Sequence, residues 1–161
     1  MSDQAEPPEI LTLDPLQRDL LLPQIQAFLD ATSDADARES YTALKAAVES
    51  MSVSAEQQAR LGTIVEVALE SGRIRRLFGP GAELSLNALF RKTPRGREIG
   101  RSLQELNSAL SNLKGDTVEE VTAVMRGPGS WALTVKTSGC QMVIRFERDG
   151  VRVESLEVAL E

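Results

Sequence analysis

The fold of this chain is decided by residues 116–161, DTVEEVTAVMRGPGSWALTVKTSGCQMVIRFERDGVRVESLEVALE. Apolar and polar residues alternate here with a period of two, which is typical of strands that bury one face. Turn residues interrupt the alternation at Gly127-Pro128-Gly129, Ser138-Gly139 and Asp149-Gly150, and the last two predict two-residue hairpin connections. The pattern therefore predicts a four-stranded antiparallel β-meander.

The turns also predict which residues face one another across neighbouring strands, because loop length sets the register of a hairpin. On one face of the sheet every predicted pair is apolar. The pairs are Val121–Val135, Ala123–Leu133 and Met125–Trp131 across the first hairpin, and Val135–Met142, Leu133–Ile144 and Trp131–Phe146 across the second. We therefore expect a continuous apolar face that other elements must cover.

The third hairpin is predicted from a pairing of Arg148 with Val151 across Asp149-Gly150. The resulting pairs are Phe146–Val153 on the apolar face, and Glu147–Arg152 and Arg145–Glu154 on the charged face. Opposite charges across neighbouring strands support this register. Because the apolar pattern then slips by one position, we expect a β-bulge near Ser155.

Residues 10–115 read as a helical region that follows a flexible tail at residues 1–9. Asp14 and Pro15 predict the start of the first helix, and Pro23 is expected to kink it or divide it into two. Apolar residues at helical spacing predict a second helix over 41–51 and a third from Ser54 to near Gly72. The segment 84–90, LSLNALF, is too short for its periodicity to separate helix from strand.

A last helix is predicted to begin at Thr93-Pro94 and to end at Gly115. Its apolar side includes a candidate oligomer seam formed by Leu103, Leu106, Leu110 and Leu113. The alternating spacing of four and three residues favours a second helix lying nearly parallel to it, from this chain or from a second copy. The sequence thus predicts an α+β fold in which N-terminal helices pack on the C-terminal meander, residues 116–161, as one domain.

The residue types exclude most familiar catalytic arrangements. The chain of 161 residues has no histidine and one cysteine, so a histidine-based triad or metal site cannot form within it. Cys140 has no base beside it in the predicted register, and we interpret it as a small apolar strand residue. The two Gly-Pro-Gly segments lack the pattern of a phosphate loop and are interpreted as turns. We therefore expect no enzymatic activity, no cofactor and no bound metal.

Two features predict a cytoplasmic protein that does not enter membranes. The N-terminal residues MSDQAEPPEI do not resemble a signal peptide. No apolar run reaches the roughly 18 residues of a spanning helix. The single cysteine is compatible with a reducing compartment.

The charge of the chain is strongly segregated. Residues 73–101 carry eight basic and two acidic residues, whereas residues 1–72 carry four basic and thirteen acidic ones, so the net charges are +6 and −9. The candidate partner-binding residues are Arg73, Arg75, Arg76, Arg91, Lys92, Arg95, Arg97 and Arg101. Guanidinium groups suit phosphate or carboxylate, so the cluster could bind nucleic acid, an acidic surface of another protein, or the acidic residues 1–72 of this chain or of a second copy.

Part of this region is similar to a known family of regulators. The run VALESGRIRR, followed by FRKTPRGREI, resembles the end of the recognition helix, the wing and the next helix in winged-helix regulators of the multiple-antibiotic-resistance type. The resemblance covers about 36 residues and implies that residues 73–76 and 79–92 would approach DNA.

From these patterns we expect a non-catalytic interaction or assembly module that works through surface complementarity. Its partner is expected to be another protein or a second copy of the chain. A regulator that binds nucleic acid through the arginine cluster is the alternative.

Overall fold

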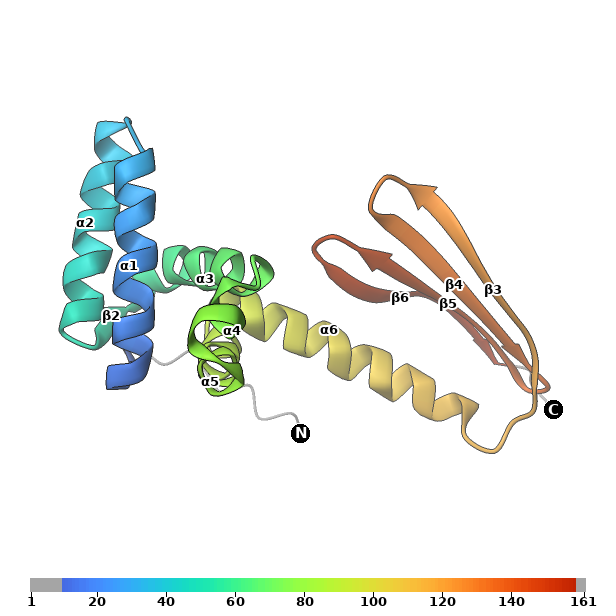
Figure 1. Cartoon of the computed structure of the whole chain (residues 1–161). Helices are drawn as coiled ribbons and strands as arrows, with labels where there is room; N and C mark the ends of the chain where they lie inside the picture. Colours follow the sequence, from blue (N-terminus) through green and yellow to red (C-terminus); the bar gives the residue numbers. More distant parts are fainter. Residues whose placement is uncertain (1–9, 159–161) are drawn as a thin grey trace. The chain divides into compact units, whose positions relative to one another are not determined.

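Six helices precede a four-stranded antiparallel sheet in the part of the chain that the computed structural model describes, residues 10–158 (Figure 1). The helices are α1 (Pro15–Ala31), α2 (Ala35–Glu49), α3 (Ala55–Glu70), α4 (Arg73–Phe78), α5 (Pro80–Phe90) and α6 (Pro94–Leu110), followed by a 3-10 turn (Ser111–Leu113). The sheet consists of β3 (Val118–Gly127), β4 (Ser130–Thr137), β5 (Cys140–Glu147) and β6 (Gly150–Val158). The α+β prediction is confirmed. The tail predicted at residues 1–9 lies outside the described residues.

The chain divides into two compact units, residues 1–97 and 98–161, so the division falls within α6. The change from helix to strand lies where the sequence predicted it, between residues 113 and 118. The expectation that all the helices and the sheet pack as one domain stays a prediction.

In the first unit, four long helices enclose one apolar core. Its fully buried side chains include Leu21, Ile25, Leu44, Val48, Leu61, Ile64, Leu86 and Leu89. A short antiparallel ribbon of β1 (Ile10–Thr12) and β2 (Ser52–Ser54) lies beside it and contributes buried Leu11 and Val53. These residues recur at three- and four-residue spacing along their helices, which is why one side of each helix becomes buried.

The N-terminus of α1 is capped as the sequence predicted. The Asp14 carboxylate accepts a hydrogen bond from the backbone N–H of Gln17 at 2.8 Å, and the Gln17 side chain accepts one from the backbone N–H of Asp14 at 3.1 Å. This reciprocal capping box satisfies two donors that a helix start leaves open, and Pro15 occupies the first turn.

Pro23 does not divide α1, because the helix continues through it to Ala31. Proline removes one backbone hydrogen bond and crowds the preceding turn. On both sides of it, however, Leu20, Leu21 and Ile25 are buried against the rest of the core. Tertiary packing therefore holds the helix together where local preference opposes it.

Replacing Pro23 with alanine is expected to stabilise the first unit by about 1–3 kcal/mol, because the N–H at this exposed position could then bond to the carbonyl of Asp19. Urea denaturation followed by near-UV absorbance of Tyr41, the chain's one tyrosine, would measure the change. An equal or lower midpoint would contradict the view that proline opposes this helix.

The segment 84–90 is helical, as part of α5. The Gly-Pro-Gly segment before it is not simply a turn, because Pro80 begins the helix. Gly79 adopts a φ of 86°, which lets the chain leave α4 and enter α5 without a longer loop. Similarly, Arg73, Arg75 and Arg76 do not trail off the end of α3 but form the separate helix α4, which follows Gly72 at a φ of 65°.

The start of α6 fits tightly against α3 and the end of α5. The Thr93 side chain is fully buried, donates to the carbonyl of Phe90 at 2.7 Å and accepts from the N–H of Gly96 at 3.2 Å. Gly62 in α3 approaches Thr93 so closely that a Cβ there would lie 3.2 Å from the Thr93 hydroxyl. A Cβ on Gly96 would lie 1.9 Å from the Phe90 carbonyl oxygen, so this position accepts only glycine.

The predicted registers of the first two hairpins are confirmed. Met125, Ala123 and Val121 pair with Trp131, Leu133 and Val135, and these pair in turn with Phe146, Ile144 and Met142. The strand order β3-β4-β5-β6 is the predicted meander.

The predicted register of the third hairpin is wrong by two residues. Glu147 pairs with Gly150, so Arg148 and Asp149 form the connection, and Phe146 pairs with Val151 instead of Val153. Gly150, at a φ of 148°, takes the last position of the turn instead of a central one.

The charge pairs predicted for this hairpin nevertheless form, because a slip of two residues leaves every side chain on its original face. Arg145 lies 2.6 Å from Glu154, and Arg152 lies 3.3 Å from Glu147. The bulge expected near Ser155 is also confirmed. Val153 pairs with Ile144 and Ser155 with Val143, so Glu154 is the extra residue.

The leucines of α6 pack against the sheet and not against another helix. Leu106 is buried together with Met142 and Ile144, and Leu110 and Leu113 pack against the same cluster. Within the chain, the sheet therefore takes the place of the predicted partner helix, because its apolar face offers these leucines a surface to pack on. The oligomer seam with a second copy stays a prediction. The fourth member of the seam, Leu103, is 45% exposed.

Candidate protein-interaction surfaces

An apolar area of the sheet is left exposed in the second unit. It lies on the face that α6 covers elsewhere and consists of Val121, Ala123 and Met125 on β3 with Trp131 on β4. Met125 is 66% exposed, Val121 57% and Trp131 52%. Phe146 on β5, the partner of Trp131 in the ladder, continues this area. We call these five residues the β3 surface.

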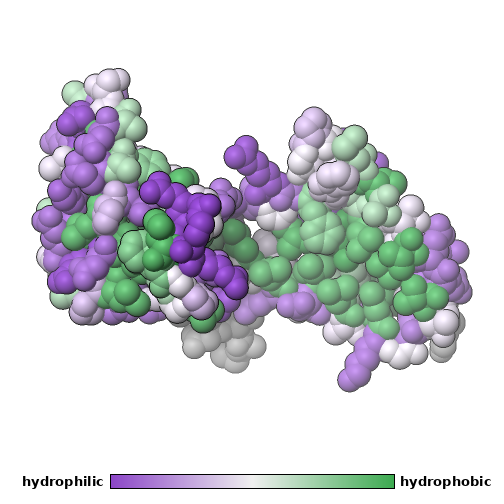
Figure 2. Space-filling model, viewed as in Figure 1, coloured by the Kyte–Doolittle hydropathy of each residue, from purple (hydrophilic) through white to green (hydrophobic). Residues whose placement is uncertain are grey.

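The β3 surface exists because one helix is narrower than the sheet it covers. The side chains packed with Leu106 come from β4, β5 and β6, and none comes from β3 among the described residues. A helix is about 10 Å across, roughly two strand spacings, so a single helix cannot shield four strands. Figure 2 shows apolar residues gathered over the strands of the second unit.

Large exposed apolar side chains indicate a binding surface when they are contiguous. Single exposed leucines or valines are common on soluble proteins, whereas a continuous patch rimmed by polar residues marks a binding surface. Trp131 and Met125 belong to the residue types enriched at the centres of protein interfaces. The β3 surface therefore has the composition of an interaction site.

The predicted arginine cluster is divided by the fold. Arg73, Arg75 and Arg76 lie on α4, before the first turn of α5, whereas Arg91 and Lys92 follow its last turn. An eleven-residue helix is about 16 Å long, so these two groups are well separated. Arg95, Arg97 and Arg101 lie on α6, and Arg101 belongs to the second unit.

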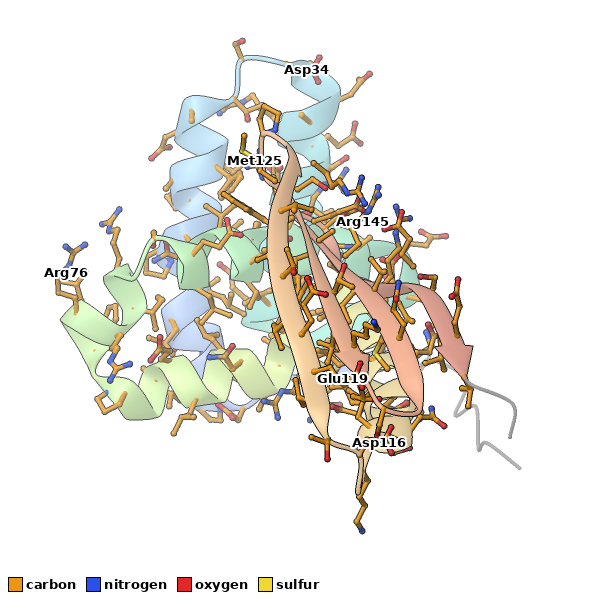
Figure 3. The ribbon with its side chains drawn as sticks, turned by 90° about the vertical axis from the view of Figure 1, so that its right-hand side faces the viewer. Asp34, Arg76, Asp116, Glu119, Met125 and Arg145 are labelled. Atoms are coloured by element: carbon orange, nitrogen blue, oxygen red, sulfur yellow. The ribbon has the colours of Figure 1, made fainter. Side chains whose placement is uncertain are left out.

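Local contacts explain part of this charge. Arg75 lies 3.4 Å from Glu83 in the first turn of α5, and Arg97 donates to the backbone carbonyl of Lys92 at 2.8 Å. Arg76 projects outward from α4 (Figure 3). Beside it, Leu77 and Phe78 are exposed, so α4 presents a mixed basic and apolar surface.

The winged-helix resemblance does not extend to the structure. The segment that the resemblance assigns to the wing, residues 79–92, contains α5, whereas a wing is a β-hairpin. Its apolar residues Ala82, Leu86 and Leu89 are buried in the core of the first unit. The expectation that this segment approaches DNA as a wing is therefore wrong.

Cys140 and a shallow depression that it lines are polar features at the β4–β5 turn. Cys140 is a buried free thiol on β5, as expected for a small apolar strand residue. The described residues contain no group of three side chains suited to hold a metal ion. A shallow depression at the β4–β5 turn includes Glu119 and Lys136, which neutralise each other at 3.8 Å.

Comparison of the chain with known families, with curated proteins and with solved structures found no match. None of the helices within residues 10–158 has the length and apolarity needed to cross a membrane.

The β3 surface is not predicted by the sequence patterns above, from which the upstream helices were expected to cover the whole apolar face. A signal was present in the run Val121-Thr122-Ala123-Val124-Met125, which contains no charged residue, glycine or proline. Such a run is unusual on a strand at the edge of a sheet.

Proposed function

We propose that this chain is a non-catalytic assembly module in which the β3 surface binds a second copy of the chain. The observation that carries the proposal is the exposed group of Trp131, Met125 and Val121 on one face of an ordered sheet. Burying a side chain of this size contributes about 1.5–3 kcal/mol, so a few of them supply most of the driving force of an interface.

A second copy of the chain is a suitable partner, because it carries the same apolar residues and both sets become buried when the two copies meet. Most soluble oligomers are homo-oligomers, and a two-fold interface buries the same patch on each subunit. The mechanism would be surface complementarity without any bond chemistry, as the lack of histidine suggests.

Light scattering across a concentration series tests the proposal. We expect a mass near twice 17.5 kDa at high micromolar concentration, falling toward 17.5 kDa on dilution. A mass of 17.5 kDa at every concentration would contradict the proposal.

A matched pair of variants locates the interface. Met125→Glu is expected to weaken self-association by at least about tenfold, because it places a charge in a buried apolar contact. Leu84→Glu changes a residue of similar exposure, 70%, in the first unit and should leave the dimer unchanged. Equal effects of the two variants would place the interface elsewhere.

The same samples can test the alternative partner. Addition of duplex DNA at low salt should leave the mass unchanged if the proposal holds. A salt-sensitive complex that is lost in Arg73→Ala and Arg76→Ala variants would instead support nucleic-acid binding by α4.

A further inference from the structure

The two edges of the sheet differ in where their charged residues and register shifts lie. β6 carries Arg152, Glu154 and Glu157, and its ladder is broken by the bulge at Glu154. These are the devices by which natural sheets prevent another strand from pairing with an edge. β3 has register shifts and charged residues only toward its ends, between Val118 and Glu120 and between Met125 and Gly127; between these points it is regular, and the five residues 121–125 are uncharged and exposed. β3 is thus the edge that remains open to pairing.

Exposed apolar side chains lie on both faces of β3. Val121 and Met125 belong to the face that α6 partly covers, whereas Val124, 42% exposed, pairs with Ala132 on the opposite face. A partner stacked on one face of the sheet would leave Val124 in water. A strand added at the edge places its own side chains beside those of β3 on both faces, so Val121, Met125 and Val124 all gain cross-strand neighbours.

The space above the face also argues for edge pairing. Two stacked sheets lie about 10 Å apart, and α6 already occupies that layer above β4, β5 and β6. A second sheet could therefore stack only on β3 and the exposed part of β4. The edge of β3 is regular and unpaired from Glu120 to Met125, where half of the backbone N–H and C=O groups point away from β4.

We propose that two copies of the chain pair antiparallel along β3, centred on Ala123, and form one continuous eight-stranded sheet. This inference rests on the self-association proposed above and adds its geometry. A two-fold axis normal to the sheet keeps the same face of both copies on the same side. Val121 of one copy then lies opposite Met125 of the other, and Glu120 opposite Arg126.

The charges at the ends of β3 complement this arrangement. Glu119 and Glu120 lie at its start, and Arg126 lies near its end; Figure 3 labels Glu119 and Met125 at opposite ends of the strand. Antiparallel pairing brings the acidic end of each copy beside the basic end of the other. Arg126 is exposed and makes no ion pair within residues 10–158.

A charge exchange tests this pairing. Glu120→Lys or Arg126→Glu alone is expected to weaken self-association by about tenfold, because each dimer then contains two like-charge pairs. The double variant Glu120→Lys/Arg126→Glu should restore the affinity. Additive losses in the double variant would overturn the pairing of these two residues.

Cysteine cross-linking distinguishes the edge geometry from self-association itself. In a Cys140→Ala background, Ala123→Cys should form an intermolecular disulfide on mild oxidation, since directly opposed Cα atoms of antiparallel strands lie about 4.5–5.5 Å apart. Leu156→Cys, on β6, serves as the matched control and should stay reduced.

The outcomes separate the two proposals. A dimer by light scattering in which Leu156→Cys cross-links, or in which neither variant does, would overturn the β3 geometry and leave the assembly function standing. A monomer at every concentration would overturn both. A dimer cross-linked through Ala123→Cys alone would support both.

Discussion

Gly96→Ala is expected to lower the free energy of unfolding of the first unit by about 3 kcal/mol, the upper part of the range for overpacked sites. A Cβ at this position would lie 1.9 Å from the Phe90 carbonyl oxygen and 2.8 Å from the Cα of Arg91. Both are backbone atoms, so relief requires the start of α6 to move away from the end of α5. That movement would also strain the hydrogen bond from Gly96 to the buried Thr93 hydroxyl.

Gly100 provides the matched control on the same helix. A Cβ there meets no atom within 4 Å, so Gly100→Ala should stabilise the helix by about 0.5–1 kcal/mol through its higher helix propensity. Urea denaturation compares the two variants, with Tyr41 as the probe of the first unit for Gly96→Ala and Trp131 as the probe of the second unit, which contains Gly100, for Gly100→Ala. If both substitutions shift the midpoint in the same direction, the close approach of Gly96 to Phe90 is not as the structure describes.

Leu106→Ala is expected to destabilise the second unit by about 2–5 kcal/mol, the usual cost of such a truncation in a core. The cluster of buried residues to which Leu106 belongs also contains Met142 and Ile144. Because this cluster is small, the unit has little other apolar burial to compensate for the loss. Denaturation followed by the fluorescence of Trp131 reports on this unit, since the tryptophan lies on β4.

Leu103→Ala, one turn earlier on α6, is the control for this prediction. Leu103 is 45% exposed, so its truncation should cost less than about 1 kcal/mol. If both variants lost a similar amount of unfolding free energy, Leu106 would not be the main contact between α6 and the sheet. If either variant lost self-association but kept its stability, the result would support the predicted oligomer seam, in which these leucines contact a second copy of the chain.

Much of the second unit could be predicted because its information is local. Strand alternation and two hairpin turns determined the pairs Leu133–Ile144 and Trp131–Phe146 without reference to any other part of the chain. The third turn was mispredicted because Arg148-Asp149 and Asp149-Gly150 are both acceptable two-residue connections. The two registers differ by two residues, so each side chain stays on the same face in both. The face of each residue was therefore predicted correctly, although its partner was not.

The helices were predictable to a similar degree, with failures where packing outweighs local preference. Asp14 and Pro15 marked the start of α1 through their own chemistry. The continuity of α1 across Pro23 and the helical state of residues 84–90 depend on burial against other helices. Such contacts join residues that are distant in the chain, so the periodicity of a few neighbouring residues does not predict them.

The candidate site shows the same division. The residue types exclude histidine-based catalysis within this chain, because chemistry that needs an absent side chain cannot occur. Recognition between surfaces stays a prediction. Which surface is available depended on folding. Leu106 and Val121 are both apolar residues in the sequence. In the structure, Leu106 on α6 is buried against β5, whereas Val121 on β3 lies beyond the reach of α6 and is exposed. Exposure is a property of what lies next to a residue in space, and a helix too narrow for its sheet is what leaves β3 uncovered.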